Sequence, residues 1–130
     1  MKKSALLLVI AALLLPAGGN LLADDAQTFT GEYVWTQRNV SDPIEAVFTP
    51  TGDGKWDVAF HFKFRGEPHV YEGQAEGSLT DGALHGEVRN ENRQRTFTFK
   101  GTFADGVFNG THREITRGRE RDTGTITLKS

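Results

Sequence analysis

Apolar and polar residues alternate with a period of two from Thr28 to the end of the chain, and turn-forming residues interrupt this alternation at short intervals. A period of two is typical of a β-strand with one buried face, and no stretch has the i, i+3, i+4 spacing of an amphipathic helix. The interruptions include TPTGDG, RGEP, TDG and TRGRE, and their Asp-Gly pairs supply the positive φ that tight hairpins need. The pattern predicts an all-β fold of about eight strands, near residues 28–36, 44–49, 55–65, 69–79, 83–90, 95–103, 107–115 and 122–129.

Large rings and glycines are predicted to share the inner face of these strands. The stretch 55–65 is the clearest, and its inner residues are Trp56, Val58, Phe60, Phe62 and Phe64. The same alternation adds Tyr33, Trp35, Ile44, Ala46, Phe48, Tyr71, Ala75, Leu79, Phe97, Phe99, Phe103, Ile126 and Leu128. The glycines on this face are Gly31, Gly73, Gly77, Gly86, Gly101, Gly110 and Gly124. Glycine inside a strand marks a bend or a close approach, so the combination predicts a strongly coiled sheet.

A coiled antiparallel meander can close on itself. We therefore expect a closed or half-closed barrel of lipocalin- or avidin-like architecture, and a two-sheet β-sandwich is the alternative. One domain of ordinary size accounts for residues 24–130.

The first 23 residues have the layout of a secretory signal peptide. Lys2 and Lys3 precede an apolar stretch at 5–15, and Pro16 and small residues lead to Ala23. The apolar stretch is about a dozen residues long, whereas a membrane-spanning helix needs about 20. We expect cleavage near Ala23, export to a periplasmic or extracellular location, and no transmembrane segment in the mature chain.

Composition narrows the classes of partner and cofactor. The chain has no cysteine, so an exported domain must be stabilised by packing rather than by disulfides. Its formal net charge is −2, which does not favour nucleic acid as a partner. The four histidines lack metal-ligand spacing, and we expect neither a metal nor a cofactor.

An internal repeat lies in the second half of the chain. The segment GSLTDGALHGEV at 77–88 aligns without gaps on GTFADGVFNGTH at 101–112, and each copy predicts a hairpin. Across 71–112 the chain resembles MORN repeats, which are glycine- and aromatic-rich β-hairpins. Val88 and His112 stand where that family usually has a further glycine. The resemblance implies stacked hairpins and contact with proteins or phospholipids.

The repeat also places two polar residues on the inner face. His112 aligns with Val88, and Glu114 follows on the same side. Three arrangements stay open. A bulge or the barrel rim turns both residues to solvent, or His112 is hydrogen-bonded in a thin part of the core. In the third, both residues form the polar end of a ligand pocket. A buried carboxylate needs a partner, and Arg95 and Arg121 are the candidates.

Two functions stay open, and the question of an enzyme stays open as well. No nucleophile elbow or phosphate-binding loop occurs, so we single out no catalytic residue. The first function is binding of a small apolar molecule or lipid by an aromatic interior. Its candidate ligand-binding residues are Tyr33, Trp35, Trp56, Phe60, Phe62, Tyr71, Phe97, Phe99, His112 and Glu114. The second is an envelope or extracellular structural or protein-interaction module with a filled core. An internal cavity distinguishes the two.

Overall fold

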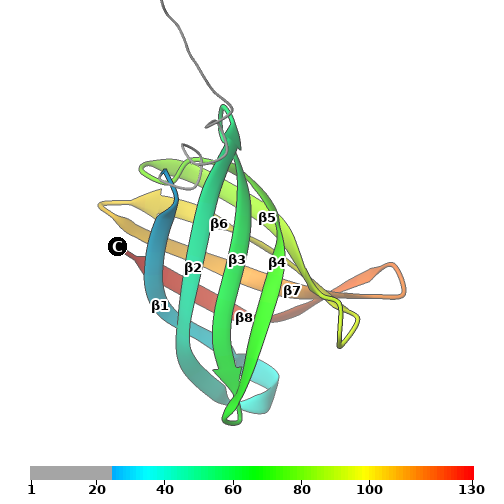
Figure 1. Cartoon of the computed structure of the whole chain (residues 1–130). Helices are drawn as coiled ribbons and strands as arrows, with labels where there is room; N and C mark the ends of the chain where they lie inside the picture. Colours follow the sequence, from blue (N-terminus) through cyan, green and yellow to red (C-terminus); the bar gives the residue numbers. More distant parts are fainter. Residues whose placement is uncertain (1–24) are drawn as a thin grey trace, which may run out of the picture.

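The computed structural model describes residues 25–130, and the predicted signal peptide, residues 1–23, lies outside them. The described residues form eight antiparallel strands in chain order, and the last strand pairs with the first, so the sheet closes into a barrel (Figure 1). The elements are β1 (Gln27–Trp35), η2 (Thr36–Arg38), β2 (Val40–Gly52), β3 (Lys55–Phe64), β4 (Glu67–Gly77), β5 (Gly82–Asn90), β6 (Arg95–Ala104), β7 (Val107–Thr116) and β8 (Arg119–Lys129). The predicted all-β meander and its closure are confirmed.

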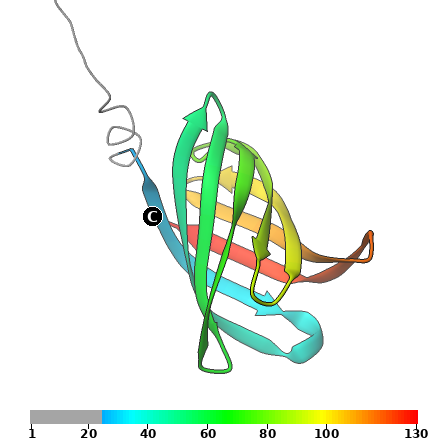
Figure 2. The same ribbon diagram turned by 45° about the vertical axis from the view of Figure 1, so that its right-hand side comes forward.

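Successive connections alternate between the two ends of the barrel. We call one end the η2 end, because it contains η2 and the turns after β3, β5 and β7; the other end, with the turns after β2, β4 and β6, is the base. In Figure 1 the β3–β4 turn lies at the bottom and the β2–β3 turn at the top, and Figure 2 shows the β7–β8 hairpin projecting from the wall. No helix within 25–130 is long and apolar enough to cross a membrane.

The inward glycines let aromatic rings lie directly on the backbone, of a neighbouring strand for Phe99 over Gly86 and of the same strand for Phe108 over Gly110. A Cβ atom on Gly86 would be 2.8 Å from the ring of Phe99, and one on Gly110 would be 2.7 Å from the ring of Phe108. Real Cβ atoms do not approach other atoms so closely. The prediction that rings cover glycines in a coiled sheet is therefore confirmed at these two positions.

The interior near the base is filled by side chains. Its most deeply buried residues are Ala46, Phe48, Leu84, Phe103, Phe108 and Leu128. Leu79, in the β4–β5 connection, is buried as well. The indole Nε1 of Trp56 donates a hydrogen bond to the carbonyl oxygen of Gly77 at 3.1 Å, so Trp56 packs at this end. The base therefore has the packed core expected of a small closed barrel.

The two copies of the sequence repeat are both hairpins, but their registers differ. Gly77 pairs with Leu84 in the first copy, whereas Gly101 pairs with Gly110 in the second. The cause is the connection: the first copy turns through residues 78–81 and the second through Asp105 and Gly106 alone. The sequence alignment thus predicts the hairpins correctly without predicting their pairing.

Candidate functional site: an aromatic collar at the η2 end

A cavity of about 80 Å³ lies inside the barrel in the half toward the η2 end. Its walls are mainly aromatic and aliphatic, with two histidines and one arginine among them. The lining residues are Tyr33, Trp35, Ile44, Phe60, Phe62, Phe64, His69, Tyr71, Val88, Arg95, Phe97, Phe99, His112 and Ile126. A mostly apolar wall with a few polar groups is the usual composition of a small-molecule site.

Six of these side chains touch one another in a closed circle, which we call the collar. In order around the circle they are Trp35, Phe64, His69, Phe62, Tyr71 and Phe97. Successive ring centroids are 5.5 to 6.3 Å apart, which is the normal separation of interacting aromatic rings. Strands β1, β3, β4 and β6 contribute the six residues, so the collar joins strands from around the barrel.

The barrel wall beside the collar is incompletely paired. The ladder between β4 and β5 ends at Glu72 and Arg89, so the first residues of β4 pair with β3 alone. Beyond that point Asn90 Nδ2 donates a hydrogen bond to the carbonyl oxygen of Val70 at 3.1 Å, and Arg93 forms an ion pair with Glu67. These side-chain contacts replace the ladder between the start of β4 and the β5–β6 hairpin.

Two buried polar atoms in the collar have no hydrogen-bond partner among the described residues. They are Nε1 of Trp35 and Nε2 of His69, whose residues are 7% and 8% exposed. Nε2 of His69 is 4.0 Å from Glu67 Oε1, which is too long for a hydrogen bond. Leaving such a group unpaired costs about 1–3 kcal/mol. The two atoms therefore indicate a place for a polar group that residues 25–130 do not supply.

The charge state of His69 follows from its surroundings. Burial lowers the pKa of the imidazole from its ordinary value, and the positive charges of Arg93 and Arg95 lower it further, against an opposing effect of Glu67. The ring is therefore neutral at neutral pH. It stacks on Phe62 with an interplanar angle of 12°, which fixes it in the collar wall.

Arg95 borders the cavity and is held by a buried carboxylate. Its Nε is 2.9 Å from Glu114 Oε2 and its Nη2 is 3.2 Å from Oε1, while Arg121 Nη2 is 2.9 Å from Oε1. Burial raises the pKa of Glu114, but the two guanidinium groups outweigh it, and the net shift is downward. The expectation that Arg95 or Arg121 partners Glu114 is confirmed for both. Two arginines facing one carboxylate leave one positive charge beside the cavity.

His112 is bonded at both nitrogens and joins the strands where the barrel closes. Its Nε2 is 2.9 Å from the carbonyl oxygen of Val34 on β1, and its Nδ1 is 2.6 Å from Thr123 Oγ1 on β8. A carbonyl can only accept, so Nε2 carries the hydrogen and Nδ1 of the neutral ring is an acceptor. The Thr123 hydroxyl has one hydrogen for two acceptors, His112 Nδ1 and the carbonyl oxygen of His112, which is 2.9 Å from Thr123 Oγ1. The ring passes over Gly124, where a Cβ would be 3.0 Å from Nε2. Burial lowers the pKa of His112, partly offset by its backbone hydrogen bonds.

The structure brings together most of the predicted ligand-binding residues. Those that line the cavity are Tyr33, Trp35, Phe60, Phe62, Tyr71, Phe97, Phe99 and His112. Trp56 and Glu114 do not: Trp56 packs at the base, and Glu114 is engaged by its two arginines. The Tyr33 hydroxyl donates to the carbonyl oxygen of Lys63 at 2.8 Å.

The sequence reasoning missed Phe64, His69 and Arg95 as cavity residues. For His69 a signal existed, because it stands two residues before Tyr71 on the same strand face. The predicted strand begins only at residue 69, directly after Pro68, whereas β4 begins at Glu67 and His69 lies inside the strand.

Comparison with known proteins assigns no family to this chain. No family model matches it, and neither does any curated protein. Its function must therefore be argued from the site.

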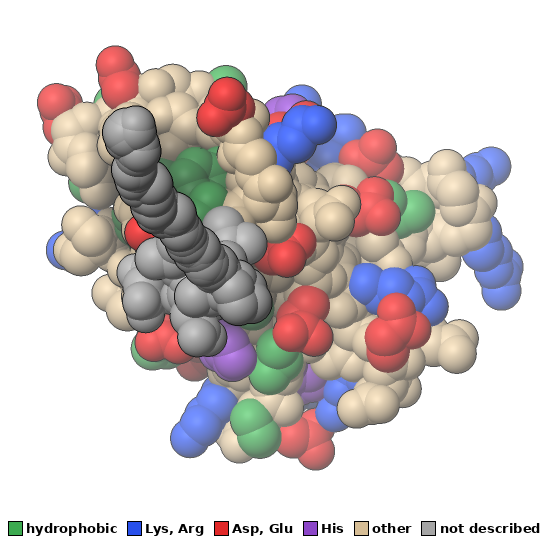
Figure 3. All heavy atoms as spheres, turned by 45° about the horizontal axis from the view of Figure 1, so that its top comes forward, with side chains coloured by type: hydrophobic (Ala, Val, Ile, Leu, Met, Phe, Trp, Pro, Cys, Tyr) green, Lys and Arg blue, Asp and Glu red, His purple; other side chains and the backbone are tan. Residues whose placement is uncertain are grey.

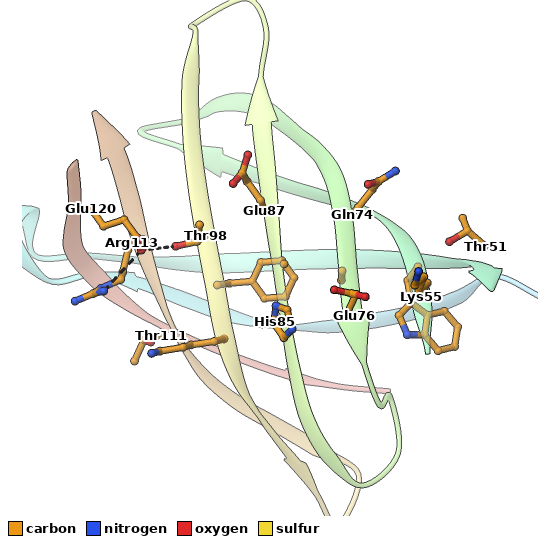
Figure 4. A pocket seen from close by; sticks show the side chains of 15 residues that line it. Thr51, Lys55, Gln74, Glu76, His85, Glu87, Thr98, Thr111, Arg113 and Glu120 are labelled. Atoms are coloured by element: carbon orange, nitrogen blue, oxygen red, sulfur yellow. Dashed lines mark hydrogen bonds and ion pairs between the residues drawn. The ribbon is translucent and has the colours of Figure 1, made fainter. Parts of the chain in front are cut away.

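A second hollow, of about 860 Å³, lies on the outer wall and is lined by residues from β2 to β8 (Figure 4). Charged side chains of both signs line it and pair with one another: Glu120 accepts from Thr98 at 3.2 Å and is 3.7 Å from Arg113. Glu76 and His85 are direct cross-strand neighbours there. Within residues 25–130 no three histidine, aspartate or glutamate side chains group as metal ligands. The outer hollow is open and polar, and the collar remains the better candidate.

Proposed function

We propose that this chain is an exported barrel that binds a small, mostly apolar molecule inside the collar. One observation carries the proposal: six aromatic side chains in mutual contact line a cavity, and two buried nitrogen atoms among them, Trp35 Nε1 and His69 Nε2, have no hydrogen-bond partner within residues 25–130. Buried polar atoms in a core without a ligand are normally hydrogen-bonded, so unpaired polar atoms in the cavity wall favour a binding site.

The volume restricts the size of the ligand. Apolar cavities of about 150 Å³ bind benzene, and sites for drug-sized molecules measure about 300–1,000 Å³. A cavity of about 80 Å³ therefore suits a molecule of a few non-hydrogen atoms, or the end of a longer one. Phe48, Phe103 and Phe108 fill the interior toward the base, so an acyl chain would find no room beyond the collar. We accordingly narrow the predicted apolar ligand or lipid to a short molecule.

Export is the second part of the proposal, and it rests on the sequence of residues 1–23. The basic start, the short apolar stretch and Ala23 are typical of a secretory signal. The ligand would then be one that occurs in a periplasmic or extracellular space.

Binding should be weak, and this decides the experiment. A ligand of about five non-hydrogen atoms, at a ceiling of about 1.5 kcal/mol per atom, binds no tighter than about 3 μM. Such a ligand washes off during purification, so we would titrate ¹⁵N-labelled protein with n-propanol and follow backbone and indole amide signals. We expect shifts confined to the collar and saturating with concentration.

A matched pair of variants locates the binding. Val88 lines the cavity, whereas Val47 is half-buried and does not. Val88→Leu adds a methylene to the wall and should weaken the binding of n-propanol; Val47→Leu should leave it unchanged. If n-propanol and propionate both leave the collar signals of the unmodified protein in place, the proposal is wrong, and a structural or interaction module becomes the better account.

A further inference from the structure

The connections of the barrel are sorted by charge. Each of the four connections at the η2 end contains one arginine, namely Arg38, Arg65, Arg93 and Arg117, and the connection with Arg93 also contains Glu91. Each of the three connections at the base contains one aspartate and no basic residue, namely Asp53, Asp81 and Asp105. Figure 3, in which the top of Figure 1 comes forward, shows acidic side chains spread over that face. The end with the cavity is therefore the positive end of the barrel.

Two of these arginines occupy positions that disfavour them. Arg65 and Arg117 each begin a two-residue turn before glycine, with φ of 54° and 53°. Tight hairpins prefer Asn, Asp or Gly at this left-handed position, and Asp105 occupies the same position at the base with φ of 53°. A side chain kept against backbone preference points to a role for that side chain. Arginine differs from aspartate at this position in its positive charge, so the charge is the property that this role requires.

Two of these arginines, Arg38 and Arg65, lie over rings of the collar, as does Arg95 of β6. The guanidinium of Arg38 is 5.4 Å from the ring centre of Trp35, and that of Arg65 is 5.2 Å from the ring centre of Phe64. Arg95 is 5.1 Å from the ring centre of Trp35. Aromatic faces attract cations, so these faces already have their cationic partners. A cationic ligand would meet occupied faces and like charge.

The polar atoms of the collar point to the opposite kind of ligand. The indole Nε1–H of Trp35 can only donate, and a guanidinium can only donate. Arg95 gives Nε and Nη2 to Glu114, and within the described part of the chain no hydrogen bond to a side chain engages its Nη1. An acceptor oxygen, and best a charged one, satisfies Trp35 and uses the positive charge that Glu114 leaves uncompensated.

We propose that the ligand is a small carboxylate, with its apolar stem inside the collar and its carboxylate between Trp35 Nε1–H and the Arg95 guanidinium. This inference rests on the proposed function, because it specifies the ligand of the same cavity. Arg38, Arg65 and Arg117 would steer the anion toward the collar and raise its association rate, whereas Arg93 is already paired with Glu67.

The two tryptophans provide a direct assay with an internal control. Trp35 Nε1 has no partner, whereas Trp56 Nε1 is bonded to the Gly77 carbonyl. We would titrate ¹⁵N-labelled protein with propionate, n-propanol and n-propylamine, which share a three-carbon stem. Propionate should move the Trp35 indole proton downfield and leave that of Trp56 in place. Because hydrogen bonds to charged groups are about twice as strong as neutral ones, propionate should bind about tenfold tighter than n-propanol. n-Propylamine should bind most weakly.

Variants separate the carboxylate contact from the cavity itself. Trp35→Phe keeps an aromatic ring but removes the donor, so the ratio of the propionate affinity to the n-propanol affinity should fall to about one, as read from the remaining collar signals. Trp56→Phe is the matched control and should change neither. Arg65→Asn places a preferred residue in the turn; it should not destabilise the fold, but it should weaken propionate binding several-fold at low salt.

The outcomes distinguish the two proposals. Equal affinity for propionate and n-propylamine, or a Trp35→Phe variant that keeps the full preference for propionate, would overturn the carboxylate inference while leaving the binding function intact. If none of the three compounds moves the collar signals, the function itself is wrong. Saturable propionate binding that shifts the Trp35 indole supports both.

Discussion

Replacing Glu114 by glutamine should destabilise the barrel by about 2–3 kcal/mol. Glu114 is buried and accepts three hydrogen bonds from Arg95 and Arg121. A bond to a charged group is worth about 1.5–3 kcal/mol and a neutral one about 1, so neutralising the carboxylate loses about 0.5–2 kcal/mol for each bond. The side chains of Arg95 and Arg121 are 33% and 55% exposed, and solvent screening keeps the total in the lower part of that range.

Urea unfolding followed by circular dichroism measures this loss as a change in the free energy of unfolding. Glu120→Gln is the control, because that carboxylate is 47% exposed and also faces an arginine; it should cost less than about 0.5 kcal/mol. The pKa of folded Glu114 is lowered, so the stability it adds is present above pH 4.5 and is lost as the pH falls through the folded pKa. The gap between the unmodified protein and Glu114→Gln should therefore narrow in acid. The reasoning would be refuted if Glu114→Gln lowered the free energy of unfolding by less than about 0.5 kcal/mol at pH 7. It would also be refuted if Glu120→Gln lowered it as much as Glu114→Gln does.

Three further predictions concern the packing and titration of the barrel. Burial lowers the pKa of His69 and His112 from 6.5, so as the pH falls these histidines are protonated in the unfolded chain before they are protonated in the folded protein. The free energy of unfolding should therefore decrease below pH 6.5, by at most about 1.4 kcal/mol per pH unit for each histidine. Equal stability at pH 7.5 and 5.5 would contradict this. Gly86→Ala should cost about 1–3 kcal/mol in urea unfolding, because its Cβ would lie 2.5 Å from the carbonyl oxygen of Gln74 and 2.8 Å from the Phe99 ring. Gly52→Ala, whose Cβ meets only the Lys55 side chain at 3.9 Å, should be nearly neutral. Thr123→Val leaves His112 Nδ1 without a partner in a buried site, so it should decrease the free energy of unfolding by about 1–3 kcal/mol and lower the melting temperature. An unchanged melting temperature would show that the Thr123 hydroxyl does not stabilise His112.

The strands were predictable because each carries its own signal. Alternation and turn residues are local properties, and all eight strands lie where these place them. The main error is the start of β2, which begins at Val40 rather than near 44. Asp42 and Pro43 look like turn residues, but Pro43 lies opposite Glu32 of β1, while the ladder with β3 begins only at Ile44. Proline is tolerated there because the strand has only one partner at that point.

The site was predictable only in part, because alternation gives the face of a residue and not its height along the barrel. Trp56 and Trp35 both face inward, yet one packs at the base and the other in the collar. That difference depends on the registers of all the intervening strands. Glu114 is a second example: it was correctly predicted to face inward, but it does not line the cavity as predicted, because its height along the barrel depends on the strand registers. The resemblance of 71–112 to MORN repeats stays a prediction.

One functional signal was present in the sequence but needed the topology before it could be read. Arginine and aspartate alternate between successive connections along the chain: Arg38, Asp53, Arg65, Asp81, Arg93, Asp105, Arg117. Glu91, which shares a connection with Arg93, is the one charged residue of the connections that departs from this order. In a Greek-key sandwich, long connections would carry such residues to different edges, and the alternation would have no common direction. In an up-and-down meander every second connection returns to the same end, so alternation along the chain becomes separation of charge along the barrel axis. The positive end is the one that holds the unpaired indole of Trp35. Surface charge and buried donor therefore favour the same negatively charged oxygen, although they arise from different parts of the sequence.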